Sequence, residues 1–321
     1  MVTEVGKYYL GVDLGSTTAK SVIVDERGAI VGSNVVQMGA VSKEGMRRSV
    51  EGALLAAGLV RDDISGTIGT GYGRRLVPGV DRTFTEITCH ARGVAAMCPG
   101  VALVIDVGGQ DSKVIAVDDE GLVDNFAMND RCASGTGRFF EVLARAIEVD
   151  VDDLGALALR GTRDLEVSSM CATFAETELV SLLAEGAEPA DIAASVHRAV
   201  AARTLGMVAQ VGKRSPVVMT GGVAKNAAAV KFLADLLGTD VRVPADPQVT
   251  GAYGAALLAL ETYGANGSEP GSDVEFPVRA APGCATCALV NGGSTSTPGA
   301  HDAGAHAAAA TPLRLTIHSH R

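Results

Sequence analysis

The sequence predicts an α/β protein with two units, each built around three consecutive strands that form a meander. Two observations support this prediction: one segment of the chain is repeated, and glycine-rich turns follow strand-like runs at three places. The chain has 321 residues, 47% of them hydrophobic, which is enough to bury two cores of ordinary domain size. We expect a first unit over residues 1–100, a second over residues 101–260, and a flexible, low-complexity tail over residues 261–321.

The charge of the chain argues against some classes of partner. The formal net charge is −10 and no basic stripe offsets it, so neither nucleic acid nor an anionic membrane surface is an expected partner. The N-terminus lacks the pattern of a signal peptide, and apolar runs such as Ala255–Leu260 are too short to span a bilayer. The six cysteines suit thiols that stay reduced or bind metal. We therefore expect a cytoplasmic protein.

The internal repeat joins residues 10–28 to residues 103–121 without a gap. The matched positions include strand-end acids, turn glycines and lysines: Asp13 with Asp106, Gly15 with Gly108, and Lys20 with Lys113. Each copy predicts a strand ending in Asp-x-Gly, a tight polar turn, a second strand, and a third strand at Ala29–Val36 or Leu122–Ala127. Two such copies facing each other would place a glycine turn on either side of a cleft.

A third glycine turn follows the strand-like run Val217–Met219. It reads Thr-Gly-Gly-Val-Ala-Lys-Asn and leads directly into a predicted helix over Ala227–Leu237. Glycines let the backbone approach a ligand closely, and a helix N-terminus favours an anion or a polar nucleotide edge. One such turn is equally typical of an ordinary strand-to-helix connection, but three in this order favour a nucleotide site.

The three turns resemble those of the superfamily of actin, hexokinase and the DnaK-type chaperones. The resemblance implies a two-lobed actin-like (ribonuclease H-like) ATPase fold, in which the first two turns hold the phosphates of ATP and the third holds the adenosine. No P-loop motif is present. Glu141 is the candidate for the ribose hydroxyls, although a solvated helix acid is an equal interpretation. The residues expected to bind the nucleotide and its Mg²⁺ are Asp13, Gly15, Ser16, Thr17, Thr18, Ala19, Lys20, Asp106, Gly108, Gly109, Gln110, Glu141, Gly221, Gly222 and Asn226.

Individual roles follow from the chemistry of these side chains. Asp13 and Asp106 end their strands inside the expected cleft, where Mg²⁺ that keeps most of its waters requires carboxylates. Lys20 either neutralises phosphate charge or points to solvent. Gln110 is expected to contact the γ-phosphate and to orient the attacking water, and Asp111 is either a helper base or a turn residue.

Cys132 and Cys171 each precede a predicted helix, over Arg138–Glu148 and Ala172–Leu183. The positive end of a helix favours a thiolate or an anionic metal cluster, whereas a lone cysteine is otherwise a small buried hydrophobic residue. Two thiolates cannot complete a zinc site or a four-cysteine iron–sulfur cluster. A symmetric dimer would supply four.

The family resemblance is carried by EITCHARG, IDVGGQDSKVI, MNDRCASGTGRFFEVLARAI, SSMCATFAETELVSLLA and MTGGVAKN. These segments resemble the activator ATPases of 2-hydroxyacyl-CoA dehydratases, a family that includes the ATPase subunits of benzoyl-CoA reductases. The resemblance runs from Tyr8 to about Leu260. It implies that Cys132 and Cys171 bind one [4Fe–4S] cluster shared within a homodimer. It also implies that ATP hydrolysis drives an electron from ferredoxin or flavodoxin through this cluster into the partner dehydratase.

Three alternatives remain open at this stage: a benzoyl-CoA reductase subunit, a sugar or carboxylate kinase of the same fold, and an actin-like filament protein. A kinase would leave the paired cysteines unexplained. The glycine-rich segment Gly69–Arg74 is interpreted as a loop between the lobes, because no helix and no ribose-binding acid follow it at the spacing of a dinucleotide site.

The remaining cysteines and histidines are given no catalytic role. Cys89 and Cys98 lie in and after the predicted helix Glu86–Met97 and are assigned to core packing, while His90 is placed near the surface. His197 is interpreted as structural. The tail contains Cys284 and Cys287, and is interpreted as a solvated extension.

Overall fold

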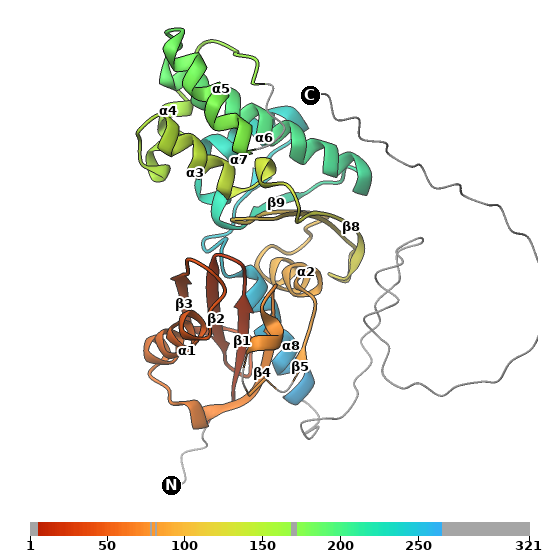
Figure 1. Ribbon diagram of the computed structural model, residues 1–321. Coiled ribbons are helices and arrows are strands. Elements are labelled where there is room, and N and C mark those ends of the chain that lie inside the picture. Colours follow the sequence, from red (N-terminus) through yellow and green to blue (C-terminus); the bar gives the residue numbers. More distant parts are fainter. Residues whose placement is uncertain (1–5, 78, 81, 168–171, 265–321) are drawn as a thin grey trace, which may run out of the picture. The chain divides into compact units, whose positions relative to one another are not determined.

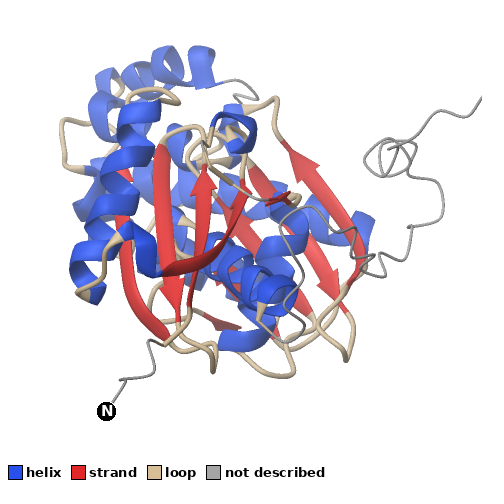
Figure 2. Cartoon of the chain, turned by 90° about the horizontal axis from the view of Figure 1, so that it is seen from below, coloured by secondary structure: helices blue, strands red, loops and turns tan. Residues whose placement is uncertain are grey.

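A computed structural model describes residues 6–77, 79–80, 82–167 and 172–264. The strands form two five-stranded sheets with helices packed against them (Figures 1 and 2). The first sheet contains β1 (Tyr8–Leu14), β2 (Thr18–Val24), β3 (Ile30–Gln37), β4 (Ile64–Thr70) and β5 (Arg82–Thr83), in the order β3-β2-β1-β4-β5. The second contains β6 (Leu103–Val107), β7 (Ser112–Val117), β8 (Val123–Asn129), β9 (Val217–Thr220) and β10 (Val241–Arg242), in the order β10-β9-β6-β7-β8.

The sequence repeat corresponds to a structural repeat. In each copy the first strand pairs antiparallel with the second, and the second with the third. Each first strand has a parallel neighbour on its other side, β4 beside β1 and β9 beside β6. The registers are equivalent, because Asp13 lies opposite Lys20 and Asp106 lies opposite Lys113. The predicted pair of meanders is confirmed.

Helices cover both faces of the first sheet. Side chains alternate along a strand, so Tyr9 and Leu10 face opposite sides of β1. Tyr9 belongs to a core that includes α8 (Thr250–Tyr263), and Leu10 to a core that includes α1 (Lys43–Ala57). The side chain of Ser42 caps the N-terminus of α1, which fixes where this helix begins.

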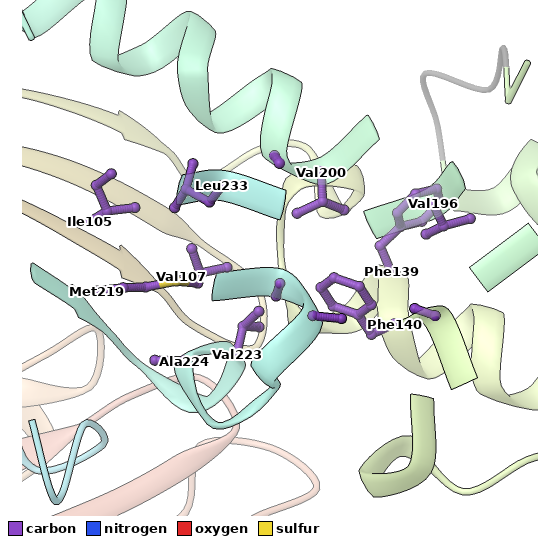
Figure 3. Close-up of a cluster of buried hydrophobic side chains, with 14 of the residues drawn as sticks. Ile105, Val107, Phe139, Phe140, Val196, Val200, Met219, Val223, Ala224 and Leu233 are labelled. Atoms are coloured by element: carbon purple, nitrogen blue, oxygen red, sulfur yellow. The ribbon is translucent and has the colours of Figure 1, made fainter. Parts of the chain in front are cut away.

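A group of helices forms the largest core with one face of the second sheet. They are α3 (Gly137–Ala146), α4 (Leu154–Ala158), α5 (Ala172–Ala184), α6 (Pro189–Val211) and α7 (Ala227–Leu237). Figure 3 shows Ile105 and Met219 of the sheet in the same cluster as Phe139, Val200 and Leu233 of the helices. Burying a side chain of this size contributes roughly 1.5–3 kcal/mol. This core therefore holds the second glycine turn and the third in fixed positions at the ends of β6 and β9.

The chain crosses from one sheet to the other at helix α2 (Glu86–Met97), and it crosses back at helix α8. Helix α2 packs on the other face of the second sheet and lies against α8. Glycines bring the two helices into backbone contact: a Cβ on Gly93 would overlap the carbonyl of Thr250, and a Cβ on Gly254 would overlap the carbonyl of Cys89. No larger residue fits at either position without moving a helix.

This packing differs from the linear division expected from the sequence. The prediction assigns α2 to the first unit and α8 to the second, whereas α2 covers a face of the second sheet and α8 covers a face of the first. Local patterns cannot show this exchange, because it depends on contacts between segments far apart in the chain. The boundaries at residues 100 and 260 stay predictions.

Other expectations have mixed outcomes. The segment interpreted as an inter-lobe loop begins inside a strand, since Gly69 and Thr70 are the last residues of β4. Cys89 and Cys98 pack in or beside cores, as expected, and burial raises the pKa of the Cys89 thiol to about 12, so it stays protonated at neutral pH. The tail with Cys284 and Cys287 lies outside the described residues. Among the described helices, none combines the length and apolarity of a membrane span.

Substituting Gly254→Ala should lower the free energy of unfolding by about 1–3 kcal/mol or more, because the new methyl group forces α2 and α8 apart. Gly206→Ala is the matched control, since Gly206 lies within α6 with open space around it. That change should stabilise the helix by roughly 0.5–1 kcal/mol. Urea unfolding of both variants measures the difference, and equal stabilities would contradict the close-contact interpretation.

Candidate functional site

A cleft of 320 Å³ is lined by all three glycine turns. Its volume lies within the range of small-molecule sites. The lining includes Gly15–Thr18 of the first turn, Gly108 and Gly109 of the second, and Gly221 and Gly222 of the third. The turns that the sequence singled out therefore meet at one cavity.

The first two turns face each other directly. A Cβ on Gly109 would lie 2.5 Å from Oγ1 of Thr17, so only glycine leaves room between them. The second turn is also fixed to the start of α3, because the backbone N–H groups of Gly137 and Arg138 donate to the carbonyls of Gly108 and Gly109, both at 2.8 Å. A displacement of this turn must therefore move the N-terminus of α3.

The third turn depends on a left-handed glycine and a buried histidine. Gly221 has φ 86°, and a Cβ there would overlap the carbonyl of Val107. Asn226 caps α7 through its Oδ1, and its Nδ2 lies 2.9 Å from Nε2 of His197. Burial lowers the pKa of His197, which favours the neutral ring that accepts this bond. His197 is structural, as expected, and it orients a predicted ligand residue.

Each meander places a carboxylate–lysine pair at the wall of the cleft. Oδ2 of Asp13 lies 3.0 Å from Nζ of Lys20, and Oδ2 of Asp106 lies 3.3 Å from Nζ of Lys113. Lys20 thus lines the cleft, and its neutralisation of phosphate charge stays a prediction. Nζ of Lys113 also lies 2.8 Å from Oδ2 of Asp111.

The second pair is held in its ionised form by its neighbours. Burial alone would raise the pKa of Asp106, but His90 and Lys113, together with a hydrogen bond from Thr220, hold that pKa well below its usual value. Burial alone would lower the pKa of Lys113, but the surrounding acids raise it well above its usual value. Both groups are therefore charged at neutral pH.

Two cleft residues on α2 were not predicted from the sequence. His90 was placed near the surface, but it is only 6% exposed, and its Nδ1 lies 3.1 Å from Oγ1 of Thr250 and 3.6 Å from Oδ1 of Asp106. Glu86, one helical turn earlier, lines the same cleft and lies 3.3 Å from Nζ of Lys113. The spacing of four residues places both on one side of α2, which is the signal that could have identified them.

Of the other residues predicted to bind the nucleotide, some line the cleft and others do not. Glu141 lines the cleft and pairs with Arg138 at 2.7 Å. Gln110 lies in the second turn with its side chain exposed, and it is not among the described residues that line the cleft. Ala19 is fully buried in β2 and likewise does not belong to the described lining of the cleft.

Cys132 lies in the connection from β8 to α3. It precedes a short 3₁₀ turn over Ala133–Gly135, and α3 begins at Gly137, one residue before the start that the sequence predicts. Its Sγ lies 2.8 Å from Oγ of Ser134 and 3.9 Å from Nη1 of Arg203. Cys171 lies outside the described residues. Within the described part of the chain, no group of three or more His, Cys, Asp or Glu side chains could hold a metal ion.

The fold and the three-turn cleft define an actin-like ATPase. The chain belongs to the BadF/BadG/BcrA/BcrD ATPase family, whose model matches residues 10–259. The activator of lactoyl-CoA dehydratase from Anaerotignum propionicum is 45% identical over 254 residues, which cover 79% of this chain and 98% of the relative. The family expected from the sequence is confirmed.

Solved structures support the same conclusion. The activator of 2-hydroxyisocaproyl-CoA dehydratase from Clostridium difficile, with bound ADPNP, matches with a TM-score of 0.76 and 42% identity over 79% of this chain and 94% of that one. One of the subunits of benzoyl-CoA reductase from Thauera aromatica is a more distant relative, 33% identical over 64% of this chain and 75% of its own length. A glucokinase from Streptomyces griseus shares only the fold, with a TM-score of 0.50 and 15% identity over 79% of this chain and 99% of that one.

Replacing Lys113 by Met should lower the free energy of unfolding by about 3–5 kcal/mol at neutral pH, because three acids lose their shared buried cation. Burial raises the pKa of Glu86 and opposes the ionisation of Asp106, and without Lys113 this effect is less well offset, so protonation should restore part of the lost stability as the pH falls. We therefore expect the deficit to shrink on acidification.

Urea unfolding at several pH values measures this effect. Lys231→Met is the matched control, since its pair with Asp235 on α7 is exposed and contributes under about 1 kcal/mol. A deficit for the Lys113 variant that is small, or that grows on acidification, would contradict the described network.

Proposed function

We propose that this protein is the ATP-dependent activator of a 2-hydroxyacyl-CoA dehydratase. The observation that carries the proposal is the joining of a three-turn nucleotide cleft to the Cys132 segment through the start of α3. Relatives with named activator functions match this chain over nearly their full length, which supports the same assignment. In this role, ATP hydrolysis drives the transfer of one electron from this protein to the dehydratase.

The nucleotide roles proposed from the sequence fit the cleft. Gly15–Thr18 and Gly108–Gly109 would hold the β- and γ-phosphates through backbone N–H groups and hydroxyls. The third turn and Asn226 would contact the adenosine, and Glu141 the ribose. We keep Gln110 as the residue that contacts the γ-phosphate and orients water, since its exposed side chain lies in a turn that can close over phosphate.

Mg²⁺ fits the acidic wall of this cleft. Asp13 and Asp106 are both buried there, and each already has a lysine partner. Carboxylates engaged in this way suit a cation that keeps its waters and takes its inner oxygens from ATP phosphates. Mg²⁺ would offset the negative charge that ATP adds to an already acidic site.

The iron–sulfur cluster fits the surroundings of Cys132. A hydroxyl and a guanidinium lie near its sulfur, and such donors stabilise an anionic cluster. Cys132 and Cys171 from each protomer of a homodimer would ligate one [4Fe–4S] cluster. When bound, this group would supply the low-potential electron, which ferredoxin or flavodoxin would donate to it. We propose that these reactions take place in the cytoplasm.

A component of a benzoyl-CoA reductase-type complex is the second candidate. Its supporting observation is the likeness to the benzoyl-CoA reductase subunit from Thauera aromatica, which is weaker and shorter than the likeness to the activators. A kinase is less favoured, because the likeness to glucokinase extends to the fold alone.

The proposed function predicts that the protein, purified without oxygen, activates a 2-hydroxyacyl-CoA dehydratase only with ATP and a low-potential reductant. Dehydration of lactoyl-CoA by a purified dehydratase measures the effect, and ADPNP replaces ATP in the control. Full activation with ADPNP would contradict a role for hydrolysis. Activation of a benzoyl-CoA reductase alone would favour the second candidate.

Cys132→Ser should abolish the cluster, while ATP binding is retained, because the sulfur lies outside the nucleotide cleft. Iron per dimer and visible absorption of anaerobic protein measure the loss. Cys98→Ser is the control, because Cys98 packs beside a core. Equal iron in the Cys132 variant and the wild type would show that the cluster assignment is wrong.

A further inference from the structure

One acid of the cleft has no role in the function proposed above. Glu86 is the first residue of α2, and its side chain is 19% exposed. Its Oε2 lies 3.3 Å from Nζ of Lys113, which in turn lies 2.8 Å from Asp111 of the second glycine turn. Among the described residues, Lys113 is the only partner of the carboxylate, so Oε1 is available to a water in the cleft.

The position of Glu86 places it beside the expected terminal phosphate. The first and second turns approach each other where Thr17 meets Gly109, so a phosphate held by both turns lies between them. Lys113 is the second residue of β7, which directly follows the second turn. Its side chain contacts both Asp111 of that turn and Glu86. Glu86 lines the same cleft from α2, a third element that belongs to neither turn. It can therefore face a water on the side of the phosphate that the turns leave open.

The other acids of the cleft are less suited to accept a proton. Asp13 is paired with its cross-strand lysine at 3.0 Å, and the pKa of Asp106 is held well below its usual value. Asp111 lies closer to Lys113 than Glu86 does. The acids on α3 and on the following 3₁₀ turn are more exposed to solvent. For Glu86, burial above all, with the nearby charges of Asp111 and Asp13, raises the pKa against the opposing effects of Lys113 and His90, which makes this carboxylate a stronger base.

We propose that Glu86 is a catalytic residue that accepts the proton of the water attacking ATP in this cleft. The water oxygen bonds to the γ-phosphorus, the bond from that phosphorus to the β,γ-bridging oxygen breaks, and ADP leaves with the electron pair. The proton passes to the Glu86 carboxylate and then to the phosphate product. Lys113 holds the carboxylate in place, and Gln110 orients the same water. This inference rests on the ATPase function proposed above and names a further residue for it.

Substituting Glu86→Gln keeps the size of the side chain but removes its ability to accept a proton. Single-turnover hydrolysis of ATP by the anaerobically purified protein should slow by about 10²-fold or more. The affinity for ATP, measured by calorimetry, should be unchanged. Wild-type hydrolysis should fall as the pH is lowered through the raised pKa of Glu86, and this limb of the profile should be absent from the variant. Glu86→Asp retains a carboxylate and should recover part of the rate.

Glu44→Gln is the matched control, because Glu44 also lies in the first turn of a helix, α1, but outside the cleft lining. It should hydrolyse ATP at the wild-type rate. If the Glu86→Gln variant also hydrolyses at that rate, the proposal is wrong while the ATPase function stands. If it loses ATP binding and hydrolysis together, Glu86 holds the nucleotide or the fold, and the proton-acceptor role is rejected. A wild-type protein that binds ATP without hydrolysing it would end the proposed function and this inference with it.

Discussion

A lysine buried among three acids is the interaction on which the cleft depends. The side chain of Lys113 is 3% exposed and contacts Asp106 at the end of β6, Asp111 in the second turn and Glu86 on α2. A buried charge without a partner costs several kcal/mol, so these three elements must stay together while the chain is folded. The first sheet repeats only part of this arrangement, with Asp13 and Lys20. The duplicated meander thus supplies two equivalent ion pairs, and among the described residues the second alone also contacts a helix, through Glu86.

The close contact between α2 and α8 brings polar side chains of both helices and both sheets together. Because Gly93 and Gly254 bring the helix backbones together, His90 on α2 reaches Thr250 at the start of α8. A Cβ on the next residue, Gly251, would lie 3.0 Å from Nε2 of His90 and 3.1 Å from Oδ2 of Asp13. Glycine at this position therefore leaves room for the His90 ring and the Asp13 carboxylate, while Oδ1 of Asp106 from the second sheet lies 3.6 Å from Nδ1 of the same ring. Packing and charge constrain the same few residues.

Local patterns in the sequence predicted the features that local physics determines. The meanders, the three turns and helix α7 follow from strand alternation, turn residues and helical periodicity within short segments. The spacing of Glu86 and His90 shows that the two residues share one side of α2, but not that this side faces the cleft, because His90 contacts Thr250, 160 positions later in the chain. The periodicity of α2 shows that the helix has a buried side, but not that the second sheet and α8 cover two sides of it. The exchange of α2 and α8 between the expected units has the same cause.

The path of the chain gives a physical reason for communication between nucleotide and cysteine. From the second turn the chain runs through β7 and β8 to Cys132, and then returns through α3 to the same turn. At one end, Asn129 of β8 exchanges two hydrogen bonds with the backbone of Cys132. At the other, Gly137 is bonded to the carbonyl of Gly108. Cys132 therefore lies between an anchor on the sheet and an anchor on the turn. We infer that a phosphate that moves the turn relative to the sheet would act on the short segment that holds Cys132.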